Sequence, residues 1–218
     1  MKTAFLSALI VGFGGLLAGS HFYPWVAHAR LPSQTTVVAN GGRAEQFLIR
    51  LPVDRIGSAG GASTGLRGSP AFAGMALPGE LAAEPLLIEH FKVRDSAGNV
   101  IGLAARHWSV SKDGPGTAWS LIIPSRGALM MVARGEPAAA LDAALRRSGY
   151  SAGASWEGGV RVAIGADTDD ASGTIAVGSN EFEGMRGRYS ETWNVTGVTD
   201  TGELRGTIEL NTVTFRGP

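Results

Sequence analysis

Alternating apolar and polar positions run through most of the chain after residue 30 and predict short β-strands. Phe47, Ile49 and Leu51 share one side of a strand over 45–51, which forms a hairpin with 35–39 about a Gly-containing turn. The middle of the chain repeats the pattern. Turns at 95–99 and 112–116 separate strands expected at 86–94, 100–110 and 119–123, and a fourth is expected at 129–132.

Helical periodicity is convincing in one place after the N-terminus. Pro137 opens a segment over 138–147 in which Leu141 and Leu145 share a face and Gly149 stops the helix. The pattern then returns to a period of two, with strands expected at 160–164, 173–178, 188–196 and 203–215. Eight or nine short strands with one helix indicate a mainly β fold, either an antiparallel barrel or a sandwich.

Composition and charge narrow the functional classes. The chain has 218 residues, with 19 basic and 19 acidic side chains, so no excess of positive charge is available for nucleic acid. It has no cysteine, which excludes disulfides, thiolate nucleophiles and a lipoprotein anchor.

The N-terminal segment 1–29 predicts export. A charge-free apolar run over 4–19 follows Lys2, and its length lies between that of a signal-peptide core and that of a membrane span. Aromatic residues after the run favour a retained anchor, whereas Ala27-His28-Ala29 offers a cleavage triplet. We therefore expect a single-pass anchor in the bacterial inner membrane with residues 30–218 in the periplasm. Cleavage after Ala29, which would give a soluble periplasmic or secreted protein, is the alternative.

Glycine is prominent in two places. Four glycines of the apolar segment would let it approach another membrane helix closely: Gly12, Gly14, Gly15 and Gly19. The stretch 57–80 is rich in glycine without a period and predicts a loop within the exported domain.

The region 172–193 resembles a strand–loop–strand of the allene oxide cyclase and dirigent β-barrel superfamily. The positions that carry the resemblance are Gly178, Phe182, Gly184, Arg186 and Gly187. Ser179 and Asn180 depart from the Thr-Gly usual in that family, and the stretches 91–102 and 118–123 resemble its early hairpins. The resemblance implies an eight-stranded barrel whose lumen binds a small apolar ligand. It carries over no catalytic residue, and one fold hosts many functions.

Candidate ligand-binding side chains lie on two strands. Tyr189, Glu191 and Trp193 share a strand face, as do Arg106 and Trp108. An inward Glu191 would be a desolvated acid or base, but the rarity of buried lone carboxylates favours the barrel mouth or surface. Arg106 could bind an anionic ligand, although the wet edge of a strand is the more common place for arginine.

Metal and cofactor sites are not predicted. The four histidines do not fall at ligand spacing, and Asp167, Asp169 and Asp170 lack the remaining ligands of a calcium loop. With no catalytic constellation, the sequence favours a non-enzymatic accessory subunit or binding module. Its expected partners are the lipid bilayer and membrane-protein subunits. The alternative is a cyclase or carrier acting on a small apolar ligand.

Overall fold

The structure is a computed structural model that describes residues 36–38, 42–60, 86–109, 117–124, 126–133, 137–164 and 173–216. The predicted anchor with its four glycines, most of the glycine-rich stretch and the acidic turn at 167–170 lie outside these residues. No helix among the described residues is long and apolar enough to span a bilayer.

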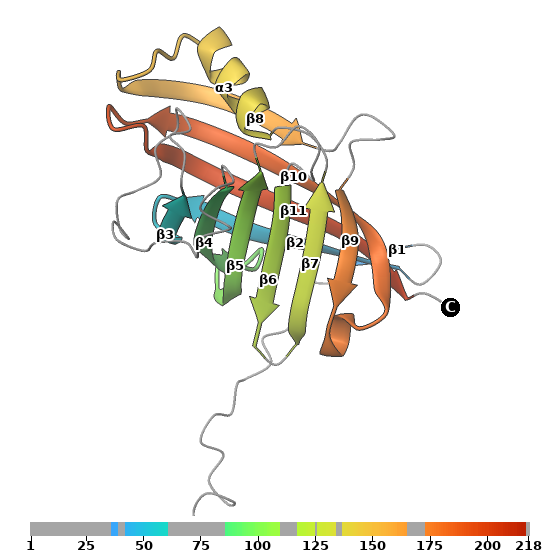
Figure 1. The fold of residues 1–218 in the computed structure, drawn as a ribbon. Coiled ribbons are helices and arrows are strands. Elements are labelled where there is room, and N and C mark those ends of the chain that lie inside the picture. Colours follow the sequence, from blue (N-terminus) through green and yellow to red (C-terminus); the bar gives the residue numbers. More distant parts are fainter. Residues whose placement is uncertain are drawn as a thin grey trace, which may run out of the picture. The chain divides into compact units, whose positions relative to one another are not determined.

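The described chain is mainly β-sheet, and every strand pairing in it is antiparallel (Figure 1). Its strands are β1 Thr36–Val38, β2 Gly42–Leu51, β3 Arg55–Gly60, β4 Leu86–Arg94, β5 Val100–Ser109, β6 Thr117–Ile123, β7 Gly127–Ala133, β8 Trp156–Ile164, β9 Gly173–Gly178, β10 Met185–Val198 and β11 Leu204–Arg216. The helices are α3, Pro137–Arg147, and a short 3-10 turn η3, Asn180–Phe182.

Eight of the strands close into a barrel, in the order β2-β11-β10-β9-β7-β6-β5-β4. The barrel closes where Leu48 of β2 pairs with Arg94 of β4. Strands β1, β3 and β8 add to this ring as partners of β2, β4 and β10. Of the two architectures that the sequence left open, the barrel is therefore the one adopted.

An ion pair with a buried carboxylate supports the seam between β2 and β4. Asp54, in the turn between β2 and β3, is fully buried, and Arg94 donates to both of its oxygens at 2.7–3.0 Å. The backbone N–H of Arg50 donates to the same carboxylate at 2.8 Å. Burial acts to raise the pKa of Asp54, but the hydrogen bonds from Arg94 and Arg50 outweigh it and lower that pKa below its usual value.

The interior of the barrel is filled by the inward-facing side chains of its strands. Alternate residues of the ring strands point inward and are buried, as predicted for Phe47, Ile49 and Leu51 and for the face that Trp119 shares with Leu121 and Ile123. The largest fully buried side chains include Trp119, Trp193, Arg106, Phe47, Phe91, Leu129 and Met131. The described interior is thus packed with bulky side chains.

Beyond the ring, the long hairpin of β10 and β11 continues and pairs with β8, and α3 packs on β8 (Figure 1). Leu141 and Leu145, the predicted apolar face of the helix, are fully buried. The N–H of Tyr150 donates to the carbonyl of Leu145, and Gly149 has a φ of 94°, so the helix ends at the glycine.

The predicted strands are confirmed, with bounds that differ by a few residues. One prediction is wrong: the loop expected from Gly57 begins later, because 55–60 form strand β3 on the edge of β4. Serine, alanine and glycine in this stretch give no alternation of apolar and polar residues, so the strand has no sequence pattern that would show it.

Candidate functional site

Charged and aromatic side chains meet inside one end of the barrel, which we call the upper end. The strand ends at Gly60, Leu86, Ser109, Thr117 and Ala133 lie there, as the pairing registers require. The cluster takes its side chains from neighbouring strands of the ring and from β3: Arg55, Glu89, Arg106, Thr117, Trp119, Tyr189, Glu191 and Trp193.

An ion pair between Arg106 and Glu191 forms the centre of this upper cluster. Nη2 of Arg106 lies 3.0 Å from Oε1 of Glu191, and neither side chain is more than 1% exposed. Both indoles donate to the carboxylate: Nε1 of Trp119 to Oε2 at 2.9 Å, and Nε1 of Trp193 to Oε1. Both carboxylate oxygens are therefore engaged within the protein.

The same two indoles flank the guanidinium. The Cζ atom of Arg106 lies 4.6 Å from the ring centre of Trp193 and 5.2 Å from that of Trp119. Cation–π attraction in a desolvated site adds to the charge pairing. Burial lowers the pKa of Arg106, while the carboxylates of Glu191 and Glu89 act to raise it. An arginine begins so far above neutrality that it stays protonated.

A second pair lies beside the first. Nη2 of Arg55 is 3.0 Å from Oε1 of Glu89, and both side chains are nearly buried. The Arg55 guanidinium also lies 5.9 Å from the ring centre of Phe91. Two cations thus accompany two carboxylates, which leaves the upper cluster electrically balanced.

Two hydroxyl groups of the upper cluster are buried without a hydrogen-bond partner among the described residues: Oη of Tyr189 and Oγ1 of Thr117. Burial raises the pKa of Tyr189, the Glu191 charge raises it further and Arg106 opposes this, so the phenol stays protonated. A buried hydroxyl in this state has capacity for a water molecule or for a polar atom of a ligand.

The structure brings together four of the five predicted ligand-binding residues: Arg106, Tyr189, Glu191 and Trp193. The Trp108 side chain lies outside the described residues. Two expected positions are wrong. Arg106 is buried rather than at a wet strand edge, and Glu191 lies in the interior rather than at the mouth or surface. Each is tolerated because the other supplies the opposite charge.

Trp119, Glu89, Arg55 and Thr117 were not among the predicted site residues. Trp119 lies directly opposite Arg106 in the register of β5 and β6. The predicted pairing of these two strands was the sequence signal that could have identified Trp119 as a neighbour of Arg106. Arg55 stands on β3, whose existence the sequence did not show.

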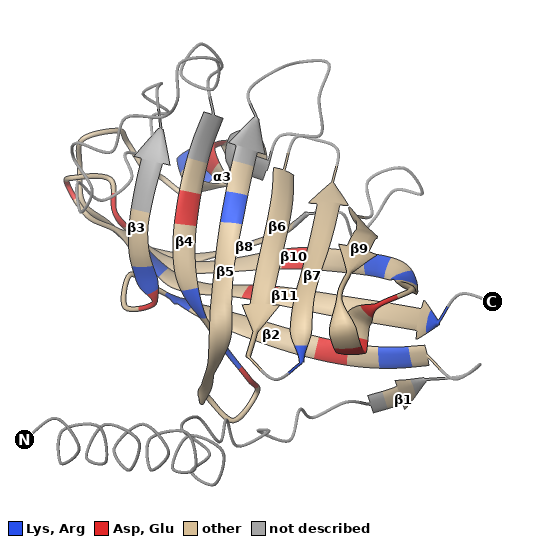
Figure 2. Cartoon of the chain, turned by 60° about the horizontal axis from the view of Figure 1, so that its bottom comes forward, with Lys and Arg blue, Asp and Glu red and all other residues tan. Residues whose placement is uncertain are grey.

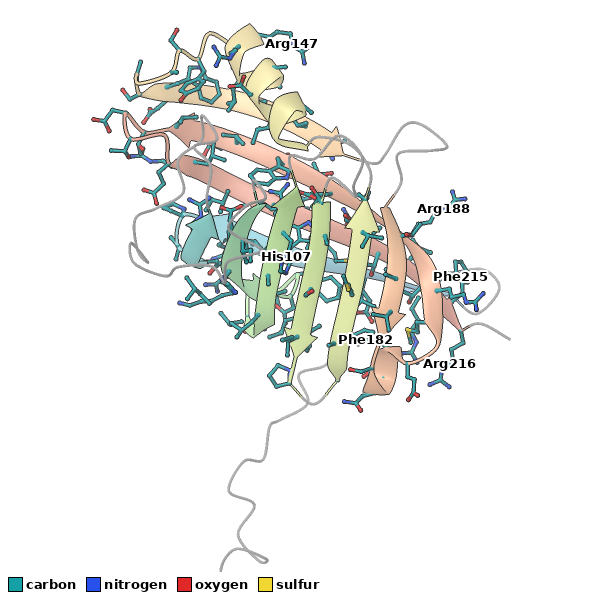
Figure 3. The ribbon with its side chains drawn as sticks, in the orientation of Figure 1. His107, Arg147, Phe182, Arg188, Phe215 and Arg216 are labelled. Atoms are coloured by element: carbon teal, nitrogen blue, oxygen red, sulfur yellow. The ribbon has the colours of Figure 1, made fainter. Side chains whose placement is uncertain are left out.

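A second polar cluster lies at the opposite, lower end of the barrel. Arg126 donates to both oxygens of Glu45 at 2.8 and 3.0 Å and to Glu181 at 3.2 Å. Its guanidinium lies 4.8 Å from the ring centre of Phe182, the last residue of η3, which Figure 3 labels at this end of the barrel. Burial alone would lower the pKa of Arg126, but its bonds to Glu45 and Glu181 raise it. This cluster ties β2, the β6–β7 turn and η3 together.

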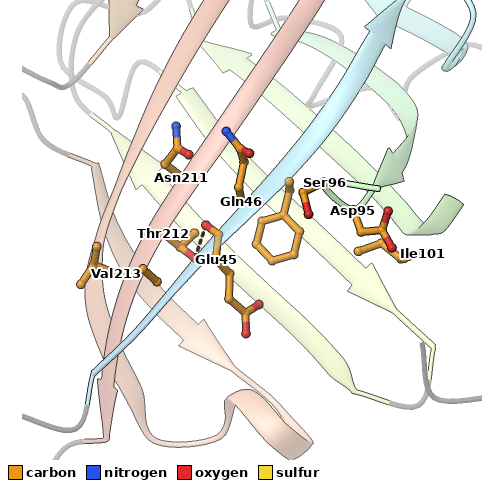
Figure 4. Close-up of a pocket in the computed structure, with 10 residues that line it drawn as sticks. Glu45, Gln46, Asp95, Ser96, Ile101, Asn211, Thr212 and Val213 are labelled. Carbon is orange, nitrogen blue, oxygen red and sulfur yellow. Dashed lines mark hydrogen bonds between the residues drawn. The ribbon is translucent and has the colours of Figure 1, made fainter. Parts of the chain in front are cut away.

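A groove of about 340 Å³ lies at the seam between β2 and β4 (Figure 4). It lies next to the Leu48–Arg94 pair, where the two strands separate. Its walls come from β2, β11, the β4–β5 turn and β5, and include Gln46, Asp95, Ser96 and Asn211. Asp95 is held by Asn99, which donates from its backbone at 2.8 Å and its side chain at 3.0 Å. Glu45, the other carboxylate of the groove, is bound to Arg126.

Within the part of the chain that the structure describes, no group of three or more acidic or histidine side chains could hold a metal ion. No family model matches the chain, and neither a curated protein nor a solved structure matches it. The resemblance to the allene oxide cyclase and dirigent superfamily therefore stays a prediction.

Proposed function

We propose that the protein is a non-enzymatic binding module, anchored in the membrane by its N-terminal segment, that serves as an accessory subunit of a membrane-protein assembly. The observation that carries this is the packing of the barrel interior, where Trp119, Trp193 and Arg106 are fully buried. A carrier or cyclase of this fold needs an open lumen with a few convergent polar groups. A packed barrel instead supports contacts made by its outer surface.

The chemistry of the upper cluster supports the same proposal. A general acid or base works best with a pKa near the operating pH and with a free path to its substrate. Glu191 is held by an arginine and two indole N–H groups, and Arg106 lies between two aromatic rings. These contacts lock the side chains in place, which suits a structural role.

Extraction of the full chain from membranes in mild detergent tests the proposal. Intact mass should show residues 1–218, and partner proteins should co-purify in fixed stoichiometry. A mass that lacks residues 1–29, found alone in the soluble fraction, would overturn it.

A carrier of a small apolar ligand is the second candidate, favoured by the two unpartnered hydroxyls of Tyr189 and Thr117. Trp119 lies on the same strand face as Thr117, and Trp193 lies on the same strand face as Tyr189, so the fluorescence of the two indoles would report an occupied lumen. Titration with oleic acid should give no saturable change if the barrel is a scaffold. A saturable change that Tyr189→Phe weakens would support the carrier instead.

A further inference from the structure

An outer face of the barrel is almost free of charge. It is formed by β5, β6, β7 and β9, which are consecutive in the ring. Arg106 is the one Lys, Arg, Asp or Glu in these four strands, and its side chain points into the barrel. Figure 2 accordingly shows the ribbons of β6 and β7 tan along most of their length. We call this surface the apolar face.

Large apolar side chains on the apolar face are exposed to solvent: Leu103 at 50%, Ile122 at 56%, Met130 at 38% and Val177 at 58%. The strand registers make them neighbours. Leu103 lies directly opposite Ile122, Ile122 opposite Ala128, and Met130 opposite Val177. Met130 lies two residues along β7 from Ala128, so it is the diagonal neighbour of Ile122. The four side chains thus follow one another across the strands, and exposed apolar side chains grouped in this way mark an interaction surface.

Small residues are interspersed with these large ones. Ala105, Ala118, Ser120 and Ala128 lie at outward positions of the same strands. Large side chains of one sheet can fill the hollows above small side chains of another, as happens when two sheets pack face to face about 10 Å apart. The apolar face thus has the relief needed for close packing on a similar sheet.

The outer surface on the other side of the ring is different. Arg50, Arg188 and Arg205 are exposed on β2, β10 and β11, and Glu209 is partly exposed on β11. Charge is therefore present at ordinary outward positions of this barrel and absent from one side. The difference in charge between the two sides of the ring indicates a specific role for the apolar face.

We propose that the apolar face is a two-fold symmetric interface with a second copy of this chain. In such a contact each residue meets the same surface of its partner, so a charge near the axis would face a like charge. A face without charged side chains avoids this repulsion. The proposal deepens the proposed function, on which it rests, by naming the partner of this surface.

Other occupants fit less well. A bilayer surface is usually met by lysine, arginine, tryptophan or tyrosine, and none of these stands at a described outward position of the four strands. Specific binding of a different protein usually involves complementary charges around an apolar centre. The described outward positions of the apolar face carry no Lys, Arg, Asp or Glu that could provide such charges. A second copy needs no such charges.

The absence of cysteine makes a direct test possible. Ile122→Cys places a single thiol on the band, and Gln46→Cys places one at an exposed position on β2. The full-length variants, in native membranes, are treated with a short flexible bis-maleimide. Ile122→Cys should give a cross-linked species at twice the chain mass of 22.5 kDa, and Gln46→Cys should not.

Three results would overturn the dimer: no cross-link at Ile122→Cys, equal cross-linking of both variants, or a product containing a different protein. Where the first result is accompanied by labelling of Ile122→Cys with a lipid-soluble maleimide, the apolar face contacts the bilayer. Release of the chain from the membrane fraction is a separate observation, which contradicts the anchored module and not the dimer.

Discussion

The side chains that decide the character of this barrel are Arg106 and Glu191. A buried ion pair is a weak source of net stability, since desolvation offsets much of the attraction between the charges. Removing one partner is costly because it leaves the other charge buried and uncompensated. The indoles of Trp119 and Trp193 strengthen this dependence, since both donate to the same carboxylate.

Glu191→Gln should therefore lower the free energy of unfolding by about 3–5 kcal/mol. The double variant Arg106→Met with Glu191→Gln removes the stranded charge and should lose less than the single variant does. Urea unfolding followed by tryptophan fluorescence measures both. A single variant within about 0.5 kcal/mol of wild type, the range of ordinary surface substitutions, would show that the pair is not coupled as described.

Asp54 makes the free energy of unfolding depend on pH in the acid range. Its pKa is lowered in the folded state, so its contribution is present above the ordinary aspartate pKa of about 4 and is lost as the pH falls through the lower folded value. Unfolding free energy should therefore fall in acid below about pH 4.

Asp54→Asn should lower the free energy of unfolding by about 2 kcal/mol at pH 7, because the fully buried carboxylate loses its charge-assisted hydrogen bonds from Arg94. The difference from wild type should narrow as the pH falls, in urea titrations between pH 3 and 7. Glu183→Gln, at an exposed residue, is the control and should follow the wild-type curve. Parallel curves for wild type and Asp54→Asn would contradict the assignment.

At the scale of elements, the alternation of apolar and polar residues predicted the strands that bury one face. The strands with one buried face and the helix with Leu141 and Leu145 inward follow from periodicity, so their existence could be read from the sequence. Strand β3 could not, because small residues carry no alternation. The burial of Arg106 and Glu191 also could not, because it depends on the pairing of β5 with β6 and on ring closure, which are long-range.

Packing between β9 and β10 can be tested at Gly173. A Cβ atom there would run into the ring of Tyr189, the residue opposite it in the register. Gly173→Ala should lower the free energy of unfolding by about 1–3 kcal/mol, the usual cost of overpacking. Gly159→Ala on β8, where a Cβ atom meets nothing within 4 Å, is the matched control. Equal stabilities of the two variants in thermal unfolding would contradict this packing.

At the scale of the whole domain, the packed interior and the apolar face both indicate that the barrel binds its partners with its outer surface. Polar groups are concentrated inside the two ends of the ring, where they pair with one another: Arg106 with Glu191 above, and Arg126 with Glu45 below. Binding then falls to the outside, and the band from Leu103 to Val177 is the surface suited to it. Sequence alternation places these side chains outward, but their contiguity requires the register.

The most direct measurement is the native mass of the full-length chain in mild detergent, compared among wild type, Ile122→Glu and Gln46→Glu. A charge at Ile122 faces its own copy across the interface, whereas Gln46 lies on β2, away from the apolar face. The account predicts two copies of the chain in each particle, beside the co-purifying partner subunits, for wild type and Gln46→Glu. It predicts one copy in each particle for Ile122→Glu, and no bound small molecule. A wild-type mass with one copy and a stoichiometric apolar ligand, unchanged by Ile122→Glu, would contradict it.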